Sequence, residues 1–136
     1  MFRRILVPLD GSSLAERALP IAAHIARTLN GTIVLVRVVT TPMEMRSSLV
    51  SSLPSAAIQT MTEVHRMEAN SYLRRIAASE ELRSIPTENE VCVGQAAPAI
   101  LSVANASNID LLIMCRYGQR GRTRWMLGSV AEVAVG

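Results

Sequence analysis

Short apolar runs alternate along this chain with stretches of helical periodicity. Residues 5–7, 32–39 and 110–114 are almost wholly apolar, which is typical of strands that are buried on both faces of a sheet. Residues 87–93 mix apolar and charged side chains, as strands at a sheet edge tend to do. Alternating strands and helices predict parallel strands that are joined by right-handed crossovers.

Three helices are expected between these strands. The first begins at a capping box formed by Ser13 and Glu16, and Pro20 predicts a bend or an irregularity within it. The second is amphipathic and runs from residue 58 to about residue 81, and the third has Pro98 in its first turn. Residues 40–55 show no period and are expected to form a loop.

This order of elements predicts an α/β fold with an open, mostly parallel, doubly wound sheet and helices on both faces. The expected strand order is 3-2-1-4, with a fifth strand missing. A helix that begins near Gly128 has too few residues before Gly136 for a further strand to cover strand four. We therefore interpret residues 1–136 as a single domain that is truncated at its C-terminus.

Ligands in open parallel sheets bind beyond the carboxyl ends of the strands, where the strand order reverses. That reversal is expected between strands one and four. Asp10 follows strand one, and residues 115–129 follow strand four. The two segments should therefore meet across one crevice.

Composition excludes several classes of protein. No apolar run approaches the roughly 20 residues of a membrane helix, and the apolar stretch near the N-terminus is too short for a signal peptide. Cys92 and Cys115 are the only cysteines and have no metal-like spacing, so we expect a cytoplasmic protein without metal. All 14 basic residues are arginine, which excludes a Walker phosphate loop, a Schiff-base enzyme and a response-regulator receiver.

A segment rich in glycine and arginine follows the last apolar run. Gly118 lies in it, and Gly128 and Ser129 resemble a helix start, whose free amides and positive dipole end attract phosphate. Ser129 and Glu132 also form a capping box, which can exist simply to begin a helix. On the residues alone both interpretations stay open.

Five stretches of the chain resemble the universal stress protein family, in order and over the entire length. They are RRILVPLDGSSLAERAL, IVLVRVV, VGQAAPAI, DLLIM and GSVAE. The ATP-binding branch of that family carries glycine, two residues, glycine, nine residues, and then glycine with serine or threonine. The corresponding positions here are Cys115, Gly118, Gly128 and Ser129, so a cysteine replaces one glycine of the motif.

The resemblance implies ATP as the ligand, with or without Mg²⁺. Asp10 would lie at the ribose and adenine, the backbone of Val38 would read the adenine edge, and amides after strand four would hold the phosphates. The site expected from the resemblance comprises Pro8, Leu9, Asp10, Val38, Met114, Cys115, Gly118, Gly128, Ser129 and Val130.

Two other functions remain open at this point. Family members without the glycine loop act through dimerisation and hold no ATP, and Cys115 favours that interpretation. At most, the chain would be a slow ATP hydrolase, because Asp10 is the only acid expected at the crevice. The resemblance also implies a homodimer, and the 3% aromatic content gives no reason to expect nucleic acid.

Overall fold

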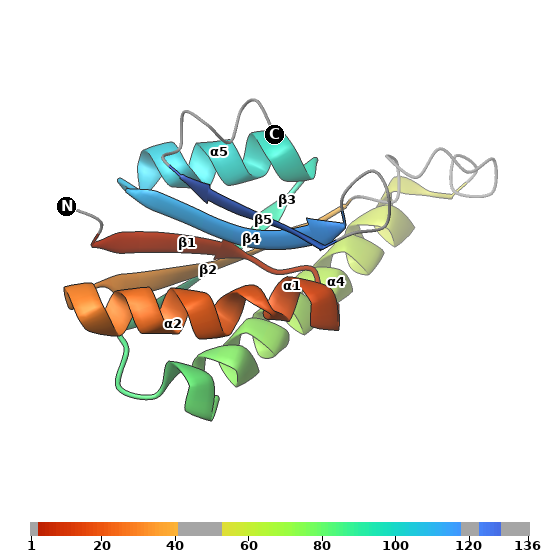
Figure 1. Cartoon of the computed structure of the whole chain (residues 1–136). Helices are drawn as coiled ribbons and strands as arrows, with labels where there is room; N and C mark the ends of the chain where they lie inside the picture. The colour runs from red at the N-terminus through yellow and green to blue at the C-terminus, as the bar shows by residue number, and fades with distance from the viewer. Residues whose placement is uncertain (1–2, 41–52, 118–122, 129–136) are drawn as a thin grey trace.

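The computed structural model describes residues 3–40, 53–117 and 123–128. Within them, strands form one sheet in the order β3-β2-β1-β4-β5 (Figure 1). β1, β2, β3 and β4 are parallel, which confirms the predicted order 3-2-1-4, whereas β5 is antiparallel to β4. The strands are β1 (Arg4–Pro8), β2 (Thr32–Val39), β3 (Thr87–Val93), β4 (Leu111–Tyr117) and β5 (Thr123–Gly128).

β5 corrects the prediction that strand four has an uncovered edge. The sequence predicts a loop over 115–129 and a helix near Gly128, but β4 continues to Tyr117 and the chain then returns as β5, beside it. The physical reason is that an apolar edge strand presents unpaired backbone groups, which a segment close in sequence can satisfy. Arginines in this segment obscure its strand character.

Helices cover both faces of the sheet. α2 and α4 lie on one face and α5 on the other (Figure 1), as the doubly wound arrangement predicts. No helix within the described ranges combines the length and the apolarity that a bilayer span requires. The helices are α1 (Ser13–Glu16), α2 (Ala18–Leu29), α4 (Ser55–Ala77), the short η2 (Glu80–Leu82) and α5 (Ala96–Ala106).

The first helical segment is interrupted, as Pro20 predicts. α1 ends at Glu16 and α2 begins at Ala18, because a proline has no N–H for the carbonyl four residues earlier and its ring crowds that carbonyl. The cap is placed one residue earlier than predicted, since the Ser12 hydroxyl, not that of Ser13, accepts a hydrogen bond from the Ala15 amide at 3.1 Å.

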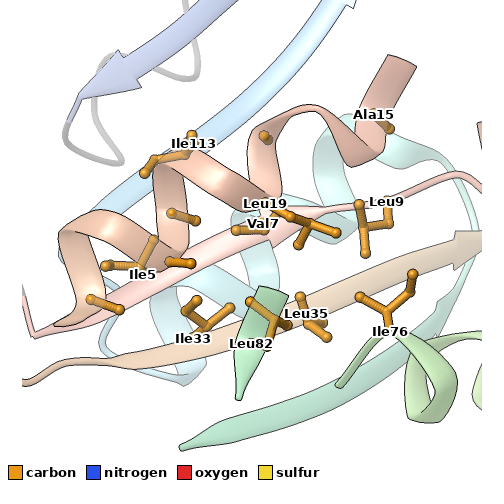
Figure 2. Close-up of a cluster of buried hydrophobic side chains, with 14 of the residues drawn as sticks. Ile5, Val7, Leu9, Ala15, Leu19, Ile33, Leu35, Ile76, Leu82 and Ile113 are labelled. Carbon is orange, nitrogen blue, oxygen red and sulfur yellow. The ribbon is translucent and has the colours of Figure 1, made fainter. Parts of the chain in front are cut away.

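Strand side chains alternate between two cores. Ile5, Val7 and Leu9 point toward α2 and α4 (Figure 2), whereas Leu6 points toward α5. Successive side chains of a strand face opposite sides, so a short apolar run supplies both cores at once. The buried strands thereby hold their carboxyl ends in fixed positions.

The amino end of the sheet is closed by polar contacts. The Asp110 carboxylate accepts hydrogen bonds from the amides of Arg3 and Arg4 at 3.1 and 3.0 Å. The Arg4 guanidinium pairs with Glu88 at 2.8 Å. Asp110 therefore has a structural role at the end of the sheet opposite Asp10.

Candidate functional site

β1 and β4 stop pairing soon after they begin. Their register comprises Ile5 with Leu111 and Leu6 with Leu112, whereas β1 pairs with β2 over its whole length. α1 and α2 follow β1 on one face of the sheet, and α5 precedes β4 on the other. The point of strand reversal thus has room for a ligand, as expected for an open parallel sheet.

A cleft of about 180 Å³ lies at this point. Six residues predicted for the site line it, from three separate stretches of the sequence: Pro8, Leu9, Asp10, Val38, Met114 and Cys115. Sequence reasoning missed the other lining residues, which are Ala15, Val36, Ala96 and Ile100. Val36 could have been found, because it lies two positions before Val38 and so shares its face of β2.

The structure does not bring Gly128 to this cleft. Gly128 is the last residue of β5 and pairs with Leu112, about 10 Å back along β4 from Cys115 at the usual strand rise. Gly118, Ser129 and Val130 lie outside the described residues. Of the predicted phosphate-binding residues, Gly128 is thus the one whose backbone the structure describes, and it lies at the end of β5.

Cys115 belongs to both the core and the cleft wall. Its side chain is 4% exposed and packs in the cluster that contains Leu9 and Ala15. Met114, the preceding residue, faces the α5 side. The thiol is thus a small apolar part of the wall, and it occupies space that a glycine would leave open.

Asp10 is the acid of the described cleft lining. Partial burial acts to raise the pKa of its carboxyl, but hydrogen bonds from Ser12 and the nearby Arg37 guanidinium outweigh this, so the pKa lies below its usual value. One of these bonds joins Asp10 Oδ1 to the Ser12 amide at 2.9 Å. At neutral pH Asp10 is therefore ionised and accepts hydrogen bonds, for example from hydroxyl groups.

Arg37 lies close to Asp10 of this cleft and also lines a hollow on the α4 side, together with Glu68 and Arg75. It is the one charged residue in β2, and its guanidinium nitrogen lies 3.3 Å from where a Cβ on Gly11 would be. Gly11 has φ +89°, a conformation that glycine adopts readily. Sequence reasoning missed Arg37, although a single charge within an apolar strand was a visible signal.

The described residues contain no group of three or more His, Cys, Asp or Glu side chains that could hold a metal ion.

The model of the universal stress protein family matches residues 1–135. The chain belongs to the universal stress protein family. Its resemblance to that family is thereby confirmed over the whole described region.

Relatives of this universal stress protein occur in distant organisms. A universal stress protein of Methanocaldococcus jannaschii is 26% identical over 132 residues, which cover 97% of this chain and 75% of the relative. The universal stress protein YxiE of Bacillus subtilis is 26% identical over 134 residues, which cover 97% of this chain and 90% of the relative.

Two solved structures share the fold. The hypothetical protein MJ0577 has a TM-score of 0.72 at 23% identity, with 99% of this chain and 89% of that one covered. The universal stress protein UspA from Lactobacillus plantarum has a TM-score of 0.67 at 20% identity, with 98% and 90% covered. This likeness supports the α/β architecture of the universal stress protein.

Proposed function

We propose that this universal stress protein is a cytoplasmic module that binds an adenine nucleotide, ATP, at the cleft between β1 and β4. The proposal rests on the meeting of residues that are distant in the sequence. Residues 8–10, Val38 and residues 114–115 are far apart in sequence, and all line one cleft at the point of strand reversal. These are the positions at which the family resemblance suggests the adenine and ribose.

The chemistry of the walls suits a nucleoside. Apolar side chains of Val38, Ile100 and Met114 offer surfaces for the base, and the ionised Asp10 carboxylate can accept a hydrogen bond from a ribose hydroxyl. Sites for whole drug-sized ligands occupy about 300–1,000 Å³, whereas this cleft has about 180 Å³. The base and sugar would therefore enter it, and the phosphates would stay outside.

The phosphates are assigned, on the sequence motif alone, to the amides of Gly118, Ser129 and Val130. Gly128 is not part of this proposal, because it pairs with Leu112. Mg²⁺ usually takes one or two carboxylates together with phosphate oxygens and water. In the described lining Asp10 is the one acid available for it.

Mass spectrometry of the freshly purified, denatured protein tests the proposal directly, and an adenine nucleotide should be released. Calorimetric titration of the same protein with ATP, after removal of any nucleotide, should give saturable binding. Asp10→Ala should weaken it about tenfold or more, because a hydrogen bond to a charged group is lost. The proposal would be overturned if no nucleotide were released and ATP showed no saturable binding.

Cys115→Gly tests the departure from the family motif. Removing the thiol widens the cleft wall, so the affinity for ATP should rise, whereas the matched variant Cys115→Ser keeps a side chain of similar size and should leave it nearly unchanged. Equal affinities in the two variants would show that the thiol does not narrow the site.

A second candidate function rests on the same residue. The buried Cys115 side chain and the small cleft favour a universal stress protein that acts through homodimerisation without nucleotide. The solution mass, measured by light scattering with and without ATP, distinguishes the two. A dimer that forms equally in both conditions and releases no nucleotide would support this second function.

A further inference from the structure

A second hollow lies on the α4 side of the Asp10–Gly11 turn, and we call it the α4 groove. It has a volume of about 680 Å³ and is open to solvent. Gly11 lines it from the turn after β1 and Arg37 from β2, whereas α4 contributes Val64, Met67, Tyr72 and Arg75. It shares no lining residue with the nucleotide cleft, so it is a distinct site.

Two guanidinium groups meet at one aromatic ring in this groove. Arg37 Cζ lies 4.8 Å and Arg75 Cζ 5.5 Å from the centre of the Tyr72 ring. The ring is held in place, since Tyr72 is 7% exposed and its hydroxyl donates a hydrogen bond to Glu16 Oε2 at 2.7 Å. The negative face of the ring attracts each cation and thereby offsets the repulsion between them.

The described residues offer these two arginines no ion pair, since the salt bridge found there joins Arg4 to Glu88. Glu16 and Glu68 are the carboxylates of the described groove lining, and Glu16 already accepts a hydrogen bond from the Tyr72 hydroxyl on one oxygen. A guanidinium presents its N–H groups in a planar fork that matches carboxylate and phosphate oxygens. The base of the groove is therefore suited to an anion.

The wall beside the arginines is apolar and exposed. Val64 is 47% and Met67 63% exposed on α4, and both line the groove. A methionine thioether makes favourable contacts with aromatic rings. A ligand with an anionic head and an aromatic body would match both the base and the wall.

We propose that the α4 groove binds a small organic anion, whose phosphate or carboxylate head contacts Arg37 and Arg75 and whose aromatic body lies against Val64 and Met67. The α4 groove is a separate site, and its ligand binds whether or not the cleft holds ATP. Glu68 also lines the groove and disfavours the ligand by repulsion, so Glu68→Gln should strengthen binding severalfold.

Phenyl phosphate is a suitable probe for the whole chain, with benzyl alcohol as its uncharged counterpart and inorganic phosphate as the head alone. In a titration followed by amide NMR, phenyl phosphate should shift the amide signals of Gly11 and Ser71 saturably. The amide signals of Val36 and Ile100, which line the cleft, should not change. Benzyl alcohol and inorganic phosphate should each bind at least tenfold more weakly.

Arg75→Gln should weaken phenyl phosphate at least tenfold, since it removes a charged partner of the head group. Arg74→Gln is the matched control, because Arg74 is an exposed neighbour on α4 outside the groove, and it should leave the affinity unchanged. Arg75 is also exposed, so its replacement tests the proposal without threatening the fold.

Three results would overturn the proposal. The first is the absence of saturable shifts at Gly11 and Ser71. The second is equal weakening by Arg74→Gln and Arg75→Gln, which would indicate only general attraction to a basic surface. The third is inorganic phosphate binding as tightly as phenyl phosphate, which would remove the role of the apolar wall.

Discussion

The cleft between β1 and β4 and the α4 groove lie on the two sides of one turn, and they are built in opposite ways. The cleft is small, largely apolar and formed mainly at the ends of parallel strands, whereas the groove is wide and charged and is formed by a helix that crosses the sheet. The position of the first follows from the order of the strands. That of the second depends on how individual side chains of α4 pack.

Filling each hollow separately tests whether the cleft and the groove are separate sites. Val38→Trp should close the cleft and lower the affinity for ATP about a hundredfold or more, equivalent to ~2.7 kcal/mol, while phenyl phosphate still binds the groove. Val64→Trp should have the reverse effect. Titrations of both ligands against both variants measure this, and a variant that weakens both ligands equally would show that they do not occupy separate sites.

Gly11→Ala tests the turn between the hollows. The variant should lower the free energy of unfolding by about 1–3 kcal/mol, because an L side chain is strained at this positive φ and its Cβ would crowd the Arg37 guanidinium at 3.3 Å. Gly94 also has a positive φ, but a Cβ there would meet nothing within 4 Å. Gly94→Ala is therefore the control, and an equal loss in urea denaturation would mean that the contact with Arg37 contributes nothing.

Tyr72→Phe examines the anchor of the groove. It keeps the ring that faces Arg37 and Arg75 but removes the hydrogen bond to Glu16, so the free energy of unfolding should fall by about 1 kcal/mol. A double-mutant cycle with Glu16→Ala isolates the pair. Additive losses in that cycle would contradict a direct interaction.

The smallest effect is expected from the ionisation of Asp10. Its pKa is lower in the folded chain, so its stabilising contribution is complete above the unfolded value of about 3.9 and is lost as the pH falls through the folded value. Because the side chain is exposed, the contribution should stay below about 1 kcal/mol. The stability advantage of the wild type over Asp10→Asn should therefore shrink with acidification, and an advantage that is independent of pH would contradict this origin.

The central fold could be predicted because its signals are local. The apolar run at residues 32–39 and the mixed run at 87–93 correspond to β2 and β3 residue for residue. β5 could not be predicted in the same way, since it satisfies the open edge of β4 and directly follows glycines and arginines whose sequence is typical of a loop. Edge pairing of this kind depends on tertiary geometry rather than on local pattern.

The candidate site likewise has a part that could be predicted from the sequence and a part that depends on tertiary packing. Asp10 and the end of strand four could be placed together because parallel strands bring their carboxyl ends to one edge, whereas Val38 was placed by the family resemblance. The contact between Arg37 and Tyr72 joins β2 to the C-terminal half of α4. No periodic pattern in the sequence could have predicted this contact. Ser12 replaces Ser13 as the cap for a simpler reason, because adjacent serines are equivalent in sequence but only one has the extended backbone of a cap.

Arg37 has neighbours in both directions, with Asp10 of the cleft on one side and the Tyr72 ring of the groove on the other. An anion in the groove that draws the Arg37 guanidinium toward the Tyr72 ring weakens its electrostatic attraction to the Asp10 carboxylate. If the anion in the groove thereby changes the affinity of the cleft for its ligand by some factor, the ligand of the cleft must change the affinity of the groove for the anion by the same factor. A single strand residue would then make two separate binding equilibria report on each other.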